Sequence, residues 1–223
     1  MSEIKITAII PVRKNSKRLK NKNFLTFFKG KSLLELKIDQ LKKIKSISKI
    51  VVSSDSLKAK KIAGKKNVLF HKRINYFASS RCSGSNFFKN LAESIEGEYI
   101  VYCPCTSPIL SNKTFKHFFN SFFKLRKKYD SFNTVSKLKT FMWKNQKPIN
   151  YNSMKAPNSQ DLPENYYSLT FGINIIERKK MISYKNIVGK KPKFIILDKF
   201  ESIDINDELD FKIAQAVYKK LKL

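Results

Sequence analysis

Residues 6–23 have the sequence ITAIIPVRKNSKRLKNKN, in which an apolar run is followed directly by a cluster of cations. The run, residues 6–12, lies in a predicted buried strand over 4–12, because a short apolar stretch ending in turn-forming residues is typical of an inner strand. It is too short for an export signal or a membrane helix. The polar residues after it therefore predict a loop at the carboxyl end of this strand.

Strand-like and helix-like segments alternate along most of the chain. The other predicted strands are 50–54, 68–70, 99–103, 172–176 and 194–197. The predicted helices are 32–45, 56–65, one carrying Phe87 to Ile95, one opened by Ser111, and 207–221 with Asn206 as its N-cap. Repeated βα units predict a single α/β domain over residues 1–223, with a doubly wound, mostly parallel sheet and helices on both faces. Residues 137–167 have weak periodicity and predict a small inserted lobe.

The composition is strongly basic, with 46 Lys and Arg against 17 Asp and Glu and a formal net charge of +29. Such a charge makes nucleic acid a candidate partner of the protein. The lysines are spread over the chain rather than gathered in one block, which favours a solvated surface instead. The helix opened by Ser111 has a stripe of aromatic residues at helical spacing, which we interpret as core rather than as a platform for bases. Its members are Phe115, Phe118, Phe119, Phe122 and Phe123.

The three cysteines, Cys82, Cys103 and Cys105, are an odd number and cannot all pair within one chain. We expect free thiols in a reducing cytoplasm. The histidines, His71 and His117, have no Cys or His partner at zinc spacing. No stretch of the sequence has the length and apolar character of a membrane helix, so no membrane association is predicted.

The loop that follows the first strand has the composition of a phosphate-binding site. Cations and hydroxyls such as Arg13, Ser16, Lys17 and Lys22 offset phosphate charge and donate hydrogen bonds to phosphate oxygens. The loop has neither the G-x-x-x-x-G-K-[ST] pattern of a P-loop nor the G-x-G-x-x-G of a dinucleotide site. By its composition alone, this loop could also be a solvated lysine run.

Residues 9–23, IIPVRKNSKRLKNKN, resemble the opening motif of the acylneuraminate cytidylyltransferase family, P-A-R-x-x-S-K-x-x-x-x-K-N. Six further segments resemble motifs of that family and occur in the same order. They are IVVSSD at 50–55, RINYFA at 73–78, TSP at 106–108, QDLP at 160–163, FGINII at 171–176 and SIDINDELD at 202–210. The resemblance therefore spans almost the whole chain.

The resemblance implies a nucleotidyltransferase-like variant of the Rossmann fold and an enzyme that transfers CMP from CTP to the anomeric hydroxyl of a 3-deoxy-2-keto sugar acid. Pyrophosphate is released, Mg²⁺ is the cofactor, and the product serves surface-glycan biosynthesis. A homodimer is also implied, with the lobe at 137–167 reaching across to the second subunit.

The resemblance also implies roles for individual residues. By position, Arg13, Lys17 and Lys22 are the expected catalytic cations. Nucleotide binding is expected of the same three residues together with Ser16, Asn23 and Arg73. Contact with the sugar acid is expected of Thr106, Ser107 and Gln160. Asp204 matches a magnesium-binding aspartate, and Asn206, where the family often has a second acidic residue, is a possible neutral ligand.

This chain departs from the family motifs where they concern the sugar. Pro104 and Cys105 precede Thr106 where a glutamine is expected, and Phe171 replaces the asparagine of an N-G motif. The acceptor is therefore open between sialic acid, another nonulosonate and an octulosonate. A 3-deoxy-octulosonate cytidylyltransferase is one alternative, although such enzymes usually have Ser-Thr-Arg at 16–18. The other is a basic nucleic-acid-binding protein on an α/β scaffold.

Overall fold

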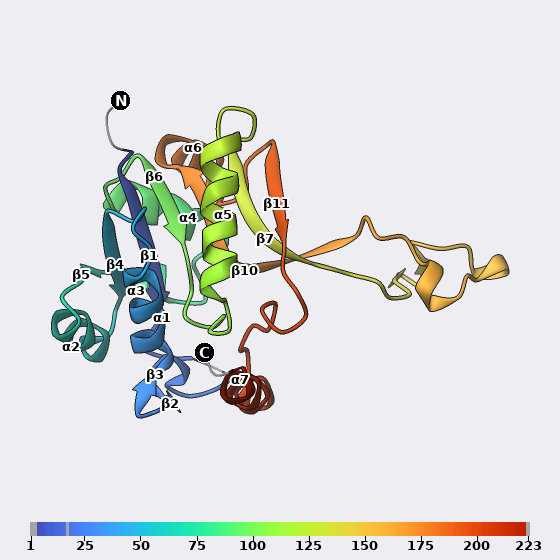
Figure 1. Cartoon of the computed structure of the whole chain (residues 1–223). Coiled ribbons are helices and arrows are strands. Elements are labelled where there is room, and N and C mark those ends of the chain that lie inside the picture. Colours follow the sequence, from blue (N-terminus) through green and yellow to red (C-terminus); the bar gives the residue numbers. More distant parts are fainter. Residues whose placement is uncertain (1–3, 17, 222–223) are drawn as a thin grey trace.

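The fold is built on a seven-stranded sheet with the order β11-β7-β10-β6-β1-β4-β5 (Figure 1). A computed structural model describes residues 4–16 and 18–221. The strands are β1 (Ile6–Val12), β4 (Lys49–Ser54), β5 (Leu69–Lys72), β6 (Tyr99–Tyr102), β7 (Ser131–Lys137), β10 (Tyr167–Glu177) and β11 (Pro192–Ile196). Among these strands β10 alone runs antiparallel to its neighbours, β6 and β7. The mostly parallel α/β sheet predicted from the sequence is confirmed.

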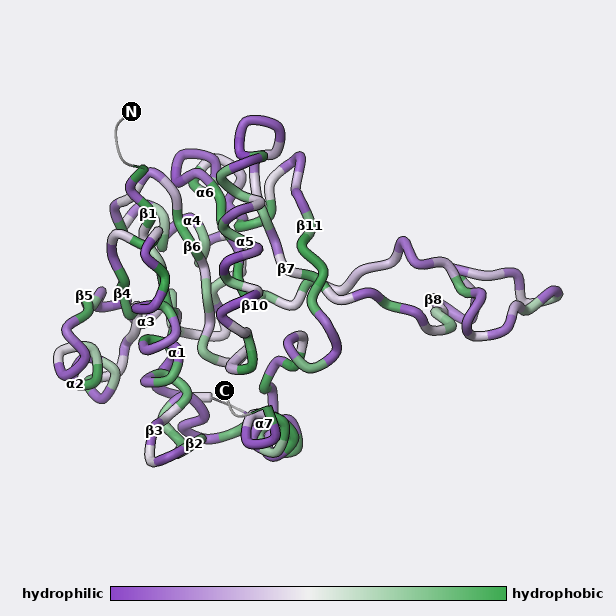
Figure 2. The backbone as a smooth tube through the Cα atoms, in the orientation of Figure 1, coloured by the Kyte–Doolittle hydropathy of each residue, from purple (hydrophilic) through white to green (hydrophobic). Residues whose placement is uncertain are grey.

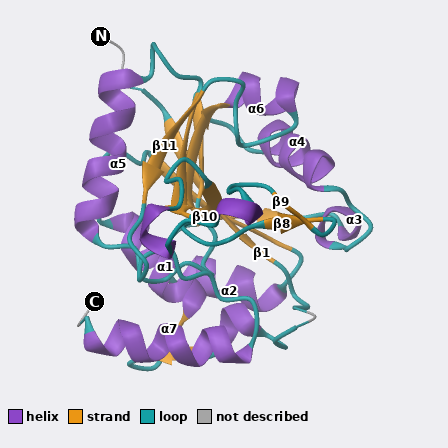
Figure 3. Cartoon of the chain, turned by 90° about the vertical axis from the view of Figure 1, so that its right-hand side faces the viewer, coloured by secondary structure: helices purple, strands orange, loops and turns teal. Residues whose placement is uncertain are grey.

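Helices cover both faces of the sheet, as the sequence predicts (Figure 3). Along β1, Ile6, Ala8 and Ile10 belong to one apolar cluster, and Ile9 belongs to a second cluster on the opposite face. The first cluster includes residues of α1 (Leu33–Lys42), α2 (Leu57–Lys65), α5 (Asn112–Leu125) and α7 (Glu208–Lys220). The second includes residues of α4 (Gly84–Ser94) and α6 (Arg178–Tyr184).

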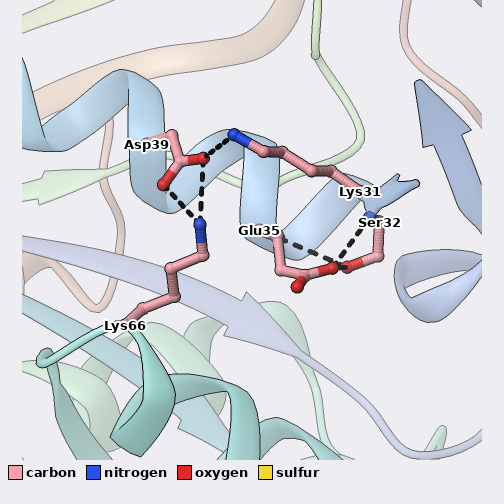
Figure 4. A network of polar contacts seen from close by, with 5 residues as sticks. All are labelled: Lys31, Ser32, Glu35, Asp39 and Lys66. Atoms are coloured by element: carbon pink, nitrogen blue, oxygen red, sulfur yellow. Dashed lines mark hydrogen bonds and ion pairs between the residues drawn. The ribbon is translucent and has the colours of Figure 1, made fainter. Parts of the chain in front are cut away.

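A small hairpin of β2 (Thr26–Phe28) and β3 (Lys31–Ser32) directly precedes α1, and side chains at this junction fix the start of the helix. Ser32 and Glu35 form a capping box, in which each side chain accepts a hydrogen bond from the other residue's backbone N–H (Figure 4). Asp39, one turn further, pairs with Lys31 and Lys66, both at 2.8 Å. The helix ends at Lys42, three residues before the predicted end.

The aromatic stripe of α5 packs into the core. Ser111 caps this helix by accepting a hydrogen bond from the N–H of Thr114, as predicted. Four of the stripe residues, Phe115, Phe118, Phe119 and Phe122, are buried, and Phe123 is 42% exposed. The interpretation of the stripe as core is confirmed for those four residues.

The cap of the last helix differs from the sequence prediction. The N-cap of α7 is Asp207, not Asn206, because the Asp207 carboxylate accepts the N–H of Asp210 at 3.0 Å. The Asp210 carboxylate in turn accepts the N–H groups of Asn206 and Asp207, which completes a capping box. The side chain of Asn206 is thereby available for other contacts.

Between Lys137, where β7 ends, and Tyr167, where β10 begins, the chain forms an arm that projects away from the sheet (Figure 1). This is the segment for which the sequence predicts an inserted lobe. The arm contains β8 (Trp143–Lys144), β9 (Lys147–Pro148) and the short 3₁₀ helices η2 (Ser153–Lys155) and η3 (Ser159–Asp161). Much of it is hydrophilic, in contrast to strands such as β11 (Figure 2). No helix within 4–16 and 18–221 has the length and apolarity to cross a membrane.

Candidate functional site

A cavity of about 320 Å³ opens where β1, β5 and β6 end. Sites in α/β sheets of this kind lie at the carboxyl ends of the parallel strands. Six of the residues predicted for the site line the cavity: Arg13, Ser16, Lys22, Asn23, Arg73 and Thr106. Residues from three separate motifs of the sequence therefore meet in one place.

The loop after β1 is held by a contact to the neighbouring strand end as well as by its own turns. The N–H of Lys14 donates to Asp55 Oδ1 at 2.7 Å. Asp55 directly follows β4, which pairs in parallel with β1, so the two strand ends are adjacent. Asn21 adopts a left-handed conformation (φ 57°) just before the 3₁₀ helix η1 (Lys22–Phe24). This turn directs Lys22 and Asn23 toward the cavity.

Lys22 is a buried lysine whose ammonium group is tied to a distant segment. Its Nζ atom donates to the carbonyl oxygen of Ile205. Burial lowers the pKa of Lys22, and the nearby carboxylate of Asp204 partly offsets that lowering. The cation is therefore placed between the first loop and the segment that precedes α7.

Arg73 is 3% exposed and lies at the end of β5. Its Nη2 atom donates to the carbonyl oxygen of Ser53 at 2.5 Å, and its Nε atom donates to Ser53 Oγ at 3.3 Å. The guanidinium also stacks 4.9 Å from the centre of the Phe87 ring. Burial lowers the pKa of Arg73 to about 10, so it remains a cation at neutral pH. Arg73 is therefore a buried cation of the cavity wall rather than a surface residue.

The segment 204–206 is attached to the end of β6. The N–H of Ile205 donates to the carbonyl oxygen of Thr106 at 2.9 Å. Asn206 lies between two charged groups, since its Nδ2 atom donates to Asp204 Oδ2 at 3.2 Å and its Oδ1 atom accepts from Arg18 at 2.7 Å. Arg18, which the sequence prediction did not include, thus joins the first loop to the Asp204 segment.

The donor set suits a hard cation that is bound mainly by phosphate oxygens. Asp204 supplies a carboxylate next to the cavity cation Lys22, and Mg²⁺ is commonly held by one or two carboxylates plus substrate phosphates. Among the described residues no three His, Cys, Asp or Glu side chains gather at a metal-binding distance. Asn206 fits less well, because its amide oxygen already accepts a hydrogen bond from Arg18.

Five predicted site residues do not line the cavity or are not described, namely Asp204 and Asn206, whose contacts are given above, and three others. Lys17 lies outside the described residues. Ser107 is buried behind the cavity wall, and its carbonyl oxygen accepts a hydrogen bond from Lys37. Gln160 lies on η3 in the arm and is exposed. The roles of Lys17 and Gln160 stay predictions.

The apolar wall of the cavity was missed in the sequence prediction. Phe87 and Tyr102 line the cavity, with ring centres 6.4 Å apart in an edge-to-face arrangement. Burial raises the pKa of the Tyr102 hydroxyl, which keeps it protonated. Cys82 also lines the cavity. Tyr102 could have been found from the sequence, because it lies at the end of a predicted strand. Phe87 could not, because it has the pattern of an ordinary apolar helix residue.

Two known proteins are similar to this chain over nearly its whole length. The chain is 26% identical over 241 residues to the N-acylneuraminate cytidylyltransferase of Escherichia coli O18:K1:H7 (strain RS218 / NMEC), with 97% of this chain and 52% of that protein covered. It is 25% identical over 236 residues to the post-translational flagellin modification protein B of Campylobacter coli, with 100% and 98% covered. The chain thus spans about half the length of the first relative and nearly all of the second.

A solved structure shares the fold. The structure of CMP:2-keto-3-deoxy-manno-octonic acid synthetase complexed with CTP superposes with a TM-score of 0.70 at 10% identity, covering 97% of this chain and 99% of that one. The model of the family described as "Cytidylyltransferase" matches residues 7–207, which include every strand of the central sheet except the first residue of β1. The chain therefore belongs to the cytidylyltransferase family of nucleotidyltransferases.

Proposed function

We propose that the protein transfers CMP from CTP to the anomeric hydroxyl of a 3-deoxy-2-keto sugar acid and releases pyrophosphate. The observation that carries this proposal is the convergence of Arg13, Lys22 and Arg73 with Asn23 around one cavity at the strand ends. The family match and the relatives' names support cytidylyl transfer. The cavity supplies cations for the triphosphate and an aromatic wall, Phe87 and Tyr102, for the nucleoside.

The reaction is a displacement at the α-phosphorus of CTP. The acceptor hydroxyl oxygen forms a bond to that phosphorus, the bond to the β-phosphate bridging oxygen breaks, and the hydroxyl proton is lost. Negative charge on the triphosphate opposes attack, so cations that neutralise it lower the barrier. We assign Arg13, Ser16 and Lys22 to the triphosphate. Asn23 and Arg73 we assign to the nucleoside end.

We further propose Mg²⁺ as the cofactor, held by the carboxylate of Asp204 together with phosphate oxygens. The ion would neutralise phosphate charge and orient the pyrophosphate leaving group. Lys22 lies near Asp204. The Lys22 ammonium group and a magnesium ion held by the Asp204 carboxylate would therefore bind the same phosphates. Asn206 orients Asp204 through their hydrogen bond, and Arg18 fixes Asn206.

The acceptor is proposed to be a nonulosonate or an octulosonate that serves surface-glycan biosynthesis. The names of two relatives, an N-acylneuraminate cytidylyltransferase and a flagellin modification protein, support sugar-acid chemistry. We assign Thr106, which lines the cavity, to the acceptor. The free thiols of Cys82, Cys103 and Cys105 support a reducing cytoplasm as the site of the reaction.

We propose that two copies of the chain associate through the arm. The arm carries exposed aromatic residues, Phe141 and Trp143, each packed edge-on against Tyr151. Exposed aromatic clusters of this kind are typical of protein interfaces. A second copy would also explain how Gln160, exposed on the arm, could reach an acceptor. Gln160 would then contact the acceptor in the cavity of the second copy.

The test is pyrophosphate release by the purified protein with Mg²⁺, each of the four nucleoside triphosphates and a panel of 3-deoxy-2-keto sugar acids of eight and nine carbons. We expect release with CTP and one class of acceptor, and none without acceptor. If no acceptor supports release while the protein binds RNA or DNA tightly with a steep salt dependence, the proposal is wrong and the nucleic-acid alternative holds.

A further inference from the structure

Lys37 is a lysine in the interior of the protein that no step of the proposed reaction uses. It lies in the middle of α1 and is 1% exposed. Within residues 4–16 and 18–221, no Asp or Glu carboxylate forms an ion pair with it. An ammonium group buried without a counter-ion is costly, and an apolar residue of similar size is usually tolerated better at such a position.

The amine of Lys37 contacts the segment that follows β6. Its Nζ atom donates to the carbonyl oxygen of Ser107 at 2.8 Å and lies 5.8 Å from the centre of the Phe115 ring. The Cys103 side chain also lies near this amine. Lys37 thus holds the C-terminal end of the segment 103–107.

Two thiols extend these contacts, and the thiol of Cys105 reaches the cavity wall. Cys105 Sγ donates to Asn23 Oδ1 at 3.2 Å, and Cys103 Sγ donates to the carbonyl oxygen of Gly172 at 3.2 Å. Burial raises the pKa of Cys103, and it raises that of Cys105 to about 12, so both thiols keep their protons and can donate at neutral pH. Asn23 lines the cavity. A chain of hydrogen bonds and short peptide segments therefore runs from Lys37 to the site.

We propose that Lys37 is a positioning residue, which sets Asn23 for the nucleotide and Thr106 for the acceptor by fixing the segment between Cys103 and Ser107. Thr106 lies between Cys105 and Ser107 in sequence, and its carbonyl oxygen also accepts the N–H of Ile205. A shift of this segment would move three groups together. They are the Thr106 side chain, the Cys105 thiol that donates to Asn23, and the Thr106 carbonyl oxygen that holds the Asp204 segment through Ile205. The inference rests on the proposed function for the identity of the nucleotide, CTP.

The test compares two substitutions of nearly equal length. Lys37→Met fills the space but donates no hydrogen bond, whereas Lys37→Gln keeps a neutral N–H donor for the Ser107 carbonyl. We expect Lys37→Met to bind CTP about tenfold more weakly by calorimetry, the factor that one hydrogen bond is typically worth. Its melting temperature should be unchanged or higher. Lys37→Gln should bind within about threefold of wild type.

A matched control removes a positive charge from the same helix. Lys42 is exposed near the end of α1, and Lys42→Met should leave the affinity for CTP unchanged. A folded Lys37→Met variant with wild-type affinity would show that Lys37 is only a packing residue and would overturn the proposal. Loss of affinity in both Lys37 variants would overturn the hydrogen-bond role in favour of the charge.

Hydrogen exchange separates this inference from the proposed function, because it needs no substrate. Lys37→Met should speed exchange at amides of 103–107 and at Asn23, with the opposite end of the sheet unaffected. Unchanged exchange there would contradict positioning even if the protein proved not to bind CTP. Should Lys37→Met fail to fold, Cys105→Ala, which removes only the link to Asn23, should still weaken CTP binding, and unchanged binding would overturn the proposal.

Discussion

The ammonium group of Lys22 donates a hydrogen bond to the backbone carbonyl of Ile205, a residue 183 positions further along the chain. This contact joins the basic loop after the first strand to the segment that carries Asp204. A second contact, from Arg18 to Asn206, joins the same two segments. The basic loop and the Asp204 segment are therefore held at a fixed separation by the protein's own contacts, a preorganisation that would serve the proposed transfer.

Replacing Lys22 should strongly reduce turnover. Lys22→Met removes the cation and the link to Ile205, and loss of one donor to developing charge typically lowers kcat/KM by about a hundredfold or more. Pyrophosphate release as a function of CTP concentration measures the effect. Lys20→Met, at an exposed position of the same loop, serves as the control and should be near wild type. Equal activity of the two variants would remove Lys22 from the triphosphate site.

The lowered pKa of Lys22 predicts opposite effects of alkaline pH on activity and stability. Its folded-state pKa lies below its ordinary value of 10.5, so between these two values the unfolded state binds more protons than the folded state. The free energy of unfolding contributed by this group therefore rises with pH across that window. Turnover should fall across the same window, because the ammonium group loses its charge.

Denaturant unfolding of wild type and Lys22→Met at several pH values isolates this contribution, since other titrating groups are common to both proteins. The difference in unfolding free energy, wild type minus variant, should increase as pH rises from neutral toward 10.5. A difference that stays flat would mean that Lys22 has an ordinary pKa in the folded protein.

The sequence predicts most of the sheet because most of its strands are apolar. The strand β7 was not predicted, and the reason lies in its buried polar residues. Asn133, fully buried in β7, donates to Asn174 Oδ1 at 3.0 Å and to the carbonyl oxygen of Ile187 at 3.1 Å. A strand whose inner side chains are satisfied by such long-range hydrogen bonds has no hydrophobic alternation. Residues 131–137 therefore resemble a loop in sequence.

The site was predictable where one motif supplies several residues and unpredictable where a side chain acts through the tertiary structure. Arg13, Ser16, Lys22 and Asn23 follow one another in a single loop. Arg18 gains its role only because Asn206 lies beside it in the fold. Lys37 has the pattern of an ordinary helix lysine, and its position inside the protein depends on how α1 packs against the end of β6.

Asp55 should control the shape of the basic loop. Its carboxylate accepts the N–H of Lys14 at 2.7 Å, and removing a partner leaves that donor unpaired. We expect Asp55→Ala to raise the KM for CTP by about tenfold, with a smaller effect for Asp55→Asn, whose amide oxygen can still accept. Steady-state kinetics of both variants checks this. Identical KM values for the alanine variant and wild type would contradict the anchoring role.

Asp204 should be needed for the response to Mg²⁺ but not for folding. Asp204→Asn removes the negative charge that a magnesium ion requires while keeping the shape of the side chain. We expect an unchanged melting temperature, turnover lowered by about a hundredfold, and a higher Mg²⁺ concentration for half-maximal rate. Full turnover with an unchanged Mg²⁺ titration would exclude Asp204 as a ligand.

The arm should mediate association of two chains through its aromatic cluster. Trp143 is 55% exposed and packs against Tyr151, with ring centres 6.0 Å apart. We expect Trp143→Lys to convert a dimer into a monomer in sedimentation experiments, since a charge in an apolar interface has no partner. Phe123→Lys makes the same change at an exposed aromatic residue of α5 and should leave the dimer intact. A wild-type protein that sediments as a monomer would contradict the arm's role.

Mixing two damaged proteins tests whether the arm completes the site of the other subunit. Lys22→Met damages the cavity, and Gln160→Ala damages the arm, so each homodimer should turn over slowly. If the arm crosses, a mixed dimer has one site with an intact cavity and an intact partner arm. Random exchange of subunits should then restore about a quarter of the wild-type sites. If Gln160 instead serves the cavity of its own chain, every site in the mixed dimer carries one damaged residue, and mixing restores nothing.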